Sequence, residues 1–262
     1  MNNVLLYGGG TQSTGLLLMC LEGRLSYKLD YAIFADPGGE PDHVIDYIHR
    51  VDKYVKKKFG FKITIVNNGS LEDSLLNKES YERTASLPLF TGNGGMIRRQ
   101  CTNEYKIVPI TKFIKKEFDI SRKSKTNNEY KVNMLFGISL DEIERCRENR
   151  EWWAKNVYPL VEERIYRHET IDYINKNHPE LKDPPRSACY FCPFRTNVSW
   201  LQLKTKYPHE FEKAVKIDKA IRRHDRMDNS MYLHRSLKPL DEVKFHDSQI
   251  DIFGECEGYC GV

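Results

Sequence analysis

Residues 4–19, VLLYGGGTQSTGLLLM, hold a short apolar run, three glycines, a hydroxyl-rich turn and a second apolar run. This order predicts a β-strand, a tight loop and an α-helix. Glycines allow positive φ and let backbone N–H groups approach an anion without a Cβ in the way. The first N–H groups of the helix lack internal partners, so a phosphate can bind there. We therefore predict a nucleotide-phosphate loop made of Gly8, Gly9, Gly10, Thr11, Gln12, Ser13 and Thr14. The alternative is a glycine-rich turn without a ligand.

The segments that follow alternate between strand and helix patterns. Residues 30–35, 61–66 and 131–138 are apolar and predict three further strands, and residues 40–59 carry apolar side chains at helical spacing. Residues 105–118 predict another helix, whereas the regularity fades from residue 67 to residue 100 and residues 86–95 resemble a long loop. The alternation predicts an α/β fold with a doubly wound parallel sheet.

The second part of the chain loses strand character. Beyond Pro159 we expect a mainly helical region that carries the cysteine pairs and runs to Val262. The sequence therefore predicts a nucleotide-binding α/β domain over residues 1–158 and a helical, cysteine-bearing region over residues 159–262.

Composition restricts the class of protein. The chain has 262 residues, of which 40% are hydrophobic and 30% charged, and its mean hydropathy is −0.62. No apolar run approaches the length of a membrane span, and the first strand begins almost at Met1, which leaves no room for a signal peptide. The seven cysteines are an odd number, which favours metal or redox chemistry in a reducing compartment. We expect a cytoplasmic protein. The net charge of +4 suits an anionic substrate without requiring a nucleic acid.

Polar residues follow two of the predicted strands. Doubly wound sheets bind ligands at the carboxyl ends of their strands. We therefore expect Ala35 and Asp36 near the adenosine of a nucleotide. The turn after residue 136 is expected to close the same site with Gly137, Ser139, Asp141, Glu142 and Arg145. The alternative for this turn is a surface helix with an ion pair between Asp141 and Arg145.

Two arginines directly precede a cysteine that is a candidate for metal binding. Arg98 and Arg99 end a glycine-rich stretch just before Cys101. Because a guanidinium can bind two phosphate oxygens at once, we assign both arginines to stabilisation of leaving phosphates.

The cysteines favour a metal centre. Cys189 and Cys192 are separated by two residues, a spacing that lets both thiolates face one metal ion. Cys256 and Cys260 supply two further thiolates near the end of the chain. A closed structural zinc site with four cysteine ligands is therefore one alternative, and a redox dithiol is another. Cys20 falls on an apolar helix face and is expected in the core.

The glycine loop resembles the S-G-G-x-D-S motif of the adenine-nucleotide α-hydrolase superfamily, also named the PP-loop ATP pyrophosphatases. Gly9, Gly10 and Ser13 match this motif, whereas Gly8 stands in place of its Ser and Gln12 in place of its Asp. The resemblance implies ATP cleavage between the α- and β-phosphates, or binding of adenylyl sulfates.

Further segments resemble the phosphoadenosine-phosphosulfate-reductase-like proteins of phages and bacteria. They are RRQCTNEYKIVPI at 98–110, GISLDEIER at 137–145, SACYFCPF at 187–194 and the final ECEGYCGV. The resemblance implies a [4Fe-4S] cluster with Cys101, Cys189 and Cys192 as ligands. Its fourth position is either open or closed by Cys260. The tail also resembles the segment that carries the nucleophilic cysteine of sulfonucleotide reductases, which implies Cys256 or Cys260 as a nucleophile.

The leading expectation is an ATP-dependent enzyme of sulfur transfer. It would adenylate a nucleic-acid or small-molecule acceptor with the help of Mg²⁺ and then deliver sulfur from a thiol or sulfide donor. The first alternative is a reductase of adenylyl sulfates. The second is a non-catalytic nucleotide-binding module with a structural zinc.

Overall fold

A five-stranded parallel sheet forms the centre of the molecule. The computed structural model describes residues 1–76, 87–121, 130–222 and 230–245. The strand order is β3-β2-β1-β5-β6, so the chain moves outward from β1 first to one edge and then to the other. All neighbouring strands of this sheet are parallel. The strands are β1 (Asn2–Leu6), β2 (Tyr31–Asp36), β3 (Ile63–Asn67), β5 (Val132–Phe136) and β6 (Ala154–Val157).

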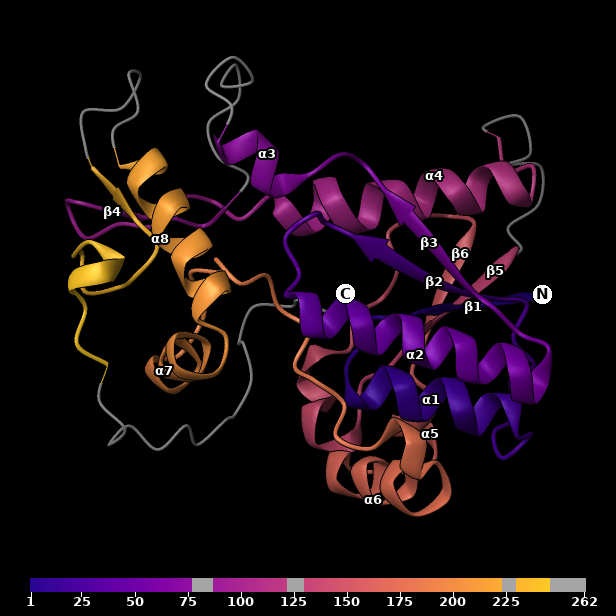
Figure 1. Cartoon of the computed structure of the whole chain (residues 1–262). Helices are drawn as coiled ribbons and strands as arrows, with labels where there is room; N and C mark the ends of the chain where they lie inside the picture. Colours follow the sequence, from indigo (N-terminus) through magenta and orange to yellow (C-terminus); the bar gives the residue numbers. More distant parts are fainter. Residues whose placement is uncertain (77–86, 122–129, 223–229, 246–262) are drawn as a thin grey trace.

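Helices cover both faces of the sheet (Figure 1). One face packs against α1 (Thr11–Leu21), α2 (Asp42–Phe59), α5 (Pro159–Glu162) and α6 (Arg167–Asn177). The other face packs against α4 (Val108–Glu117), whose Ile110 and Ile114 contact strand side chains. The structure thus confirms an α/β fold with a parallel sheet between two helical layers.

The helices just after residue 158 share a core with the sheet. Gly15 of α1 lies so close to α6 that a Cβ on it would be 2.2 Å from Thr170 Cγ2. Leu160, Ile174 and Leu181 belong to the same apolar cluster as the side chains of α1 and α2. The predicted division at residue 158 therefore falls inside a continuous hydrophobic core.

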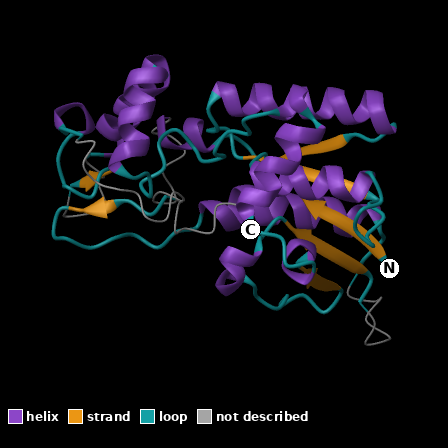
Figure 2. Cartoon of the chain, turned by 90° about the horizontal axis from the view of Figure 1, so that it is seen from below, coloured by secondary structure: helices purple, strands orange, loops and turns teal. Residues whose placement is uncertain are grey.

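A second apolar cluster lies to one side of the sheet. Its helices are α3 (Leu71–Leu76), α7 (Asn197–Lys206) and α8 (Pro208–Ile221). A short antiparallel ribbon joins β4 (Phe90–Thr91) to β7 (Met231–Tyr232), apart from the main sheet in Figure 2. Trp200 is fully buried in this cluster, as expected of a packing side chain.

Several predicted elements are confirmed and others were not predicted. All four predicted strands are present, and the helix predicted over residues 40–59 begins at Asp42. Helix α3 and strands β4 and β6 were not predicted, and β7 is an exception to the expected loss of strands beyond Pro159. The helix predicted from residue 105 begins earlier, because a π-helical segment, η2 (Asn103–Ile107), precedes α4.

Short 3₁₀ helices complete the described structure: η4 (Leu140–Arg145), η5 (Pro179–Leu181) and η6 (Leu240–Glu242). Cys20 is buried in the core, as predicted, and its burial raises the pKa of the thiol to about 12. Across the four described ranges, no helix combines the length and the apolar character that crossing a membrane requires.

Candidate functional site

The predicted glycine loop connects β1 to α1 at the carboxyl end of the sheet. Gly9 has a φ of +76°, and a Cβ on it would lie 2.9 Å from Ile48 of α2, so the fold itself requires glycine there. Gly10 is the N-cap of α1 and provides no side-chain hydrogen bond to the helix. The first N–H groups of α1 therefore have no side-chain cap, as an anion site at a helix start requires.

The hydroxyl groups of the loop bond within the protein. The Ser13 hydroxyl donates to the Gly10 carbonyl oxygen over 3.1 Å, and the Thr14 Oγ1 lies 3.1 Å from the Tyr7 hydroxyl. Burial raises the pKa of Tyr7, so its phenol stays protonated. Thr11 and Thr14 are buried as well. Of the predicted loop residues, Gly8 and Gly10 retain partial exposure.

A hydrogen-bonded network joins the start of α1 to the turn after β5. The Gln12 amide donates to Glu142 Oε2 over 2.6 Å and to Ser139 Oγ over 3.3 Å. Arg145 Nη1 lies 2.6 Å from Glu142 Oε1. Gly137 makes this approach possible, since a Cβ on it would lie 2.6 Å from the Ser13 nitrogen. The structure thus brings together residues that were predicted from two distant segments.

Two of the predicted carboxylates have structural partners. Asp141 Oδ1 accepts a hydrogen bond of 3.0 Å from the backbone nitrogen of Arg167, the first residue of α6. Asp36 Oδ1 accepts a bond of 2.8 Å from the Gly38 nitrogen. The two side chains therefore stabilise a helix start and a turn at the edge of the site.

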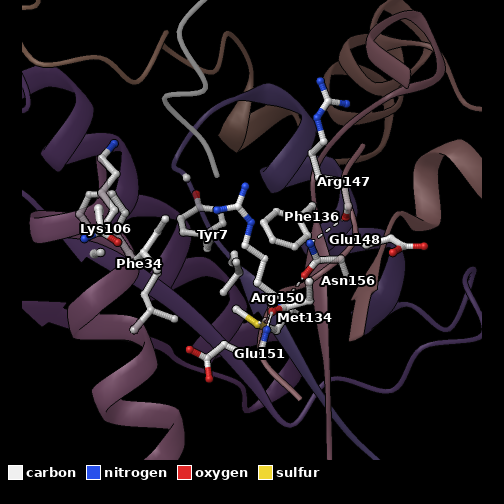
Figure 3. A pocket seen from close by; sticks show the side chains of 17 residues that line it. Tyr7, Phe34, Lys106, Met134, Phe136, Arg147, Glu148, Arg150, Glu151 and Asn156 are labelled. Carbon is white, nitrogen blue, oxygen red and sulfur yellow. Dashed lines mark hydrogen bonds between the residues drawn. The ribbon is translucent and has the colours of Figure 1, made fainter. Parts of the chain in front are cut away.

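A pocket of about 440 Å³ opens beside the loop, on the face of the sheet that α4 covers (Figure 3). The strand order reverses between β1 and β5, and both strands line the pocket with their carboxyl ends. Such a reversal is where open α/β sheets bind their ligands. Among the predicted residues, Gly8 and Ala35 line the pocket. Its apolar lining consists of Leu6, Phe34, Ala35, Ile107, Ile110, Met134 and Phe136.

The polar side of this pocket was not predicted from the sequence. It consists of Tyr7, Asn103, Lys106, Arg147, Glu148, Asn149, Arg150, Glu151 and Asn156. The segment 147–151 is anchored by Asn156, whose amide nitrogen donates to the Arg147 carbonyl oxygen over 2.9 Å. Arg150 points from this segment toward Tyr7 (Figure 3). The sequence did contain a signal for this side of the pocket. Charged residues dominate positions 144–151, which overlap and extend the segment 137–145 that was predicted to close the site.

Lys106 brings η2 to the loop after β2. Its ammonium group lies 3.2 Å from Glu40 Oε1, and the Glu40 side chain is fully buried. The second carboxylate oxygen of Glu40 is buried without a hydrogen-bond partner among the described residues. The pair therefore places a cation at the pocket and an unsatisfied acceptor behind it.

Of the predicted metal ligands, Cys189 lies near the loop after β2, and the described residues form no recognisable metal site. Cys189 Sγ would lie 3.7 Å from a Cβ on Gly39, and Cys101 and Cys189 pack against one apolar cluster. The Cys192 nitrogen donates to the Cys189 carbonyl oxygen over 3.0 Å. Within the described part of the chain, no three His, Cys, Asp or Glu side chains are grouped to hold a metal ion. Cys256 and Cys260 lie outside the described residues, so the cluster and the zinc alternative both stay predictions.

Arg195 holds the turn that carries the two cysteines. It donates to the carbonyl oxygens of Ala188 and Cys189 over 2.9 and 3.1 Å. Burial lowers the pKa of Arg195, an effect that the nearby thiols of Cys192 and Cys189 oppose. Of the two predicted phosphate ligands, Arg98 is exposed, and the Arg99 guanidinium lies 6.0 Å from the centre of the Phe194 ring.

No protein-family model, curated protein or solved structure matches this chain. A function for this chain is therefore inferred from the geometry of the site itself.

Proposed function

We propose that this chain is an adenine-nucleotide-binding enzyme that transfers the adenylyl group of ATP to an acceptor oxygen, as the activating step of a sulfur transfer. The observation that carries the proposal is the pocket between the carboxyl ends of β1 and β5, next to the uncapped start of α1. The acceptor would be a nucleic acid or a small molecule.

The pocket offers different surroundings to the two ends of a nucleotide. Apolar side chains such as Phe136 and Ile107 suit a base, whereas Gly8 and Arg150 provide donors for phosphates. The volume of about 440 Å³ lies in the range of small-molecule sites. The phosphate chain of a nucleotide bound in this pocket would extend past Gly8 to the N-terminus of α1. There the N–H groups and the helix dipole favour an anion.

In the proposed reaction an acceptor oxygen attacks the α-phosphorus of ATP. A new oxygen–phosphorus bond forms, the bond between the α-phosphorus and the bridging oxygen breaks, and pyrophosphate leaves with the electron pair. Lys106 and Arg150 would neutralise charge on the phosphates, with Mg²⁺ as the expected counterion. The acceptor proton passes to solvent.

The cysteines would deliver sulfur to the adenylated acceptor. Cys101 and Cys189 pack against one apolar cluster, and Cys189 lies near Gly39 in the loop after β2. A [4Fe-4S] cluster, when bound, would supply an iron that holds sulfide.

Pyrophosphate release tests the proposal. The full chain, purified without oxygen, is incubated with ATP, Mg²⁺ and sulfide in the presence of RNA, DNA or a pool of small molecules. ATP binding is measured by calorimetry in parallel. We expect micromolar ATP affinity and acceptor-dependent pyrophosphate. Arg150→Gln should weaken ATP binding five- to tenfold, whereas Arg164→Gln, a matched exposed arginine outside the pocket, should not.

The same assay separates the alternatives. Sulfite release from an adenylyl sulfate would establish the reductase instead. Tight ATP binding that never yields pyrophosphate would indicate the binding module. ATP affinity that Arg150→Gln leaves unchanged would contradict the assignment of this pocket.

A further inference from the structure

A second pocket, of about 370 Å³, lies between α2 and α7. We name it the cationic pocket, because its lining includes Arg50, Arg186, Arg195 and Lys206, together with His43. Asp183 is its one carboxylate among the described residues. None of these side chains lines the nucleotide pocket.

Arg186 has an unsatisfied donor in this pocket. Its Nη2 is buried and has no hydrogen-bond partner among the described residues. A buried charged donor without an acceptor is costly, because it has lost its hydration and gained nothing in return. Such an atom indicates an acceptor that binds from outside the chain.

Arg186 and Arg195 both line the cationic pocket. Arg195 is held in place, since its Nη1 donates to Ser199 Oγ over 2.8 Å. Two guanidinium groups that line one pocket are stabilised by an anion that binds both.

The other two cations that line the pocket are exposed to solvent. Arg50 is exposed on α2, where its guanidinium lies 5.0 Å from the centre of the Tyr47 ring, and Lys206 is exposed at the end of α7. The pocket therefore combines two partly buried arginines with two exposed cations, and such a group of positive charges attracts an anion.

The cationic pocket borders the glycine loop. Pro185 lines it, and the Pro185 carbonyl oxygen would lie 3.9 Å from a Cβ on Gly10. Gly8 lines the nucleotide pocket. The loop thus separates the two pockets.

We propose that the cationic pocket binds a tetrahedral oxyanion, a sulfate or phosphate group, between Arg186 and Arg195. Planar guanidinium groups bind such oxygens in pairs, and Lys206 adds a mobile point charge. The site is separate from the proposed nucleotide site and does not depend on it.

Calorimetry on the full chain tests this site, with sodium sulfate and sodium phosphate as probes at an ionic strength held constant with chloride. We expect one sulfate or phosphate per chain. Arg186→Gln should weaken binding at least tenfold and Lys206→Met about threefold. The matched controls Arg164→Gln and Lys216→Met, on exposed positions outside both pockets, should bind as the wild type does.

A crystal soaked in selenate locates the anion directly, even if Arg186→Gln fails to fold. Selenium between Arg186 and Arg195 supports the proposal. Selenium at the Gly8–Gly10 loop alone, no binding by the wild type, or unchanged binding by Arg186→Gln would each overturn it. ATP titrated into the sulfate-saturated chain separates the two sources: competition identifies a nucleotide phosphate as the occupant, and independent binding identifies a free oxyanion. Failure of the nucleotide proposal would appear as lost ATP binding with sulfate binding intact.

Discussion

Gly9 and Gly10 are adjacent but have different reasons to be glycine. Gly9 needs its positive φ and the space beside Ile48. Gly10 has a φ of −97°, which any residue adopts, and a Cβ on it would meet only the Pro185 carbonyl oxygen at 3.9 Å. The fold therefore does not require glycine at position 10, whereas the proposed nucleotide site would, because a phosphate has to approach the backbone there.

Gly10→Ala tests the loop without disturbing the fold. The added methyl group makes an ordinary contact with Pro185 and stands where phosphate oxygens would approach the first N–H groups of α1. We expect calorimetric ATP affinity to fall about tenfold, a loss of about 1.4 kcal/mol, while the melting temperature stays unchanged. Gly92→Ala, next to the β4–β7 ribbon, controls for the methyl group, because Gly92 also lacks a positive φ and its added Cβ would meet Ser230 at an ordinary 3.5 Å. Unaltered ATP binding by Gly10→Ala would show that phosphate does not bind here.

His234 is a buried histidine whose neighbours require the neutral ring. Its Nδ1 accepts a 3.2 Å hydrogen bond from the Ser236 nitrogen, and its Nε2 lies 2.8 Å from Asn197 Oδ1. Burial lowers the pKa of His234 to about 4, and the charge of Arg235 adds to this effect. In the unfolded chain a histidine titrates near 6.5.

Stability should therefore decrease as the pH falls. Because the unfolded chain binds the His234 proton more tightly, the stability that the neutral ring provides is complete above pH 6.5 and is lost between about pH 6.5 and pH 4. We expect a loss of about 2 kcal/mol over this window, measured by urea unfolding at several pH values. His234→Gln should flatten this part of the profile. If the variant retains the full slope, the titrating group is elsewhere.

At the scale of elements, the packing of α1 on α6 depends on one missing side chain. Thr170 Cγ2 occupies the space that a side chain at position 15 would need. The Thr170 hydroxyl meanwhile donates to the Tyr166 carbonyl oxygen over 3.1 Å. The methyl and hydroxyl groups of Thr170 therefore have separate roles.

A double variant exploits that separation. Gly15→Ala should reduce the free energy of unfolding by about 2–3 kcal/mol, because overpacking forces the helices apart. Thr170→Ser removes Cγ2 and keeps the hydroxyl, so Gly15→Ala combined with Thr170→Ser should recover most of the loss in urea unfolding. A double variant no more stable than Gly15→Ala alone would place the strain elsewhere.

The elements that the sequence predicted share strong local patterns. The residues of β1 and α1 flank a glycine run, and α2 buries Val44, Ile48, Val51 and Val55 along one face, so periodicity sufficed. The four residues of β6 include exposed Lys155, and their pairing with β5 is not a local property. The ribbon of β4 and β7 pairs residues about 140 positions apart, for which local propensity has no signal.

At the scale of the whole molecule, α8 stabilises the start of α2. The N-cap of α2 is Pro41, which has no side-chain hydrogen bond to offer, and the Asp42 nitrogen instead donates to Glu210 Oε1 over 2.9 Å. Glu210 is buried, and next to it the His43 ring stacks on Tyr207 at 4.0 Å. Glu210 of α8 thus provides the helix cap that Pro41, at the start of α2, does not.

Removal of that cap should destabilise the chain. Glu210→Ala leaves the Asp42 N–H without its acceptor, and we expect a loss of about 1–2 kcal/mol in urea unfolding. Glu210→Gln retains an acceptor oxygen and should cost less than half as much. Equal losses in both variants would assign the effect to the carboxylate charge.

The site was predictable only in part, because it assembles from distant segments. The glycine loop and the strand ends have local signatures, and Gln12 does meet Ser139 and Glu142. The wall that contains Arg147 and Arg150 depends on the position of β6, which was not predicted. The cationic pocket combines side chains of α2 and α7, more than 130 residues apart in the sequence. No local pattern encodes that proximity.

The π-helical segment η2 has a consequence for the evolution of this site. A wider turn accommodates one more residue than regular α-helix does, and one residue corresponds to about 100° of rotation around a helix axis. Deletion of a single codon between Asn103 and Ile107 would let the helix regularise without moving α4 from the sheet. The Cys101 side chain would then be rotated by about 100° around the helix axis, away from the apolar cluster against which Cys101 and Cys189 both pack. The orientation of that thiol therefore depends on the length of the gene at this one place.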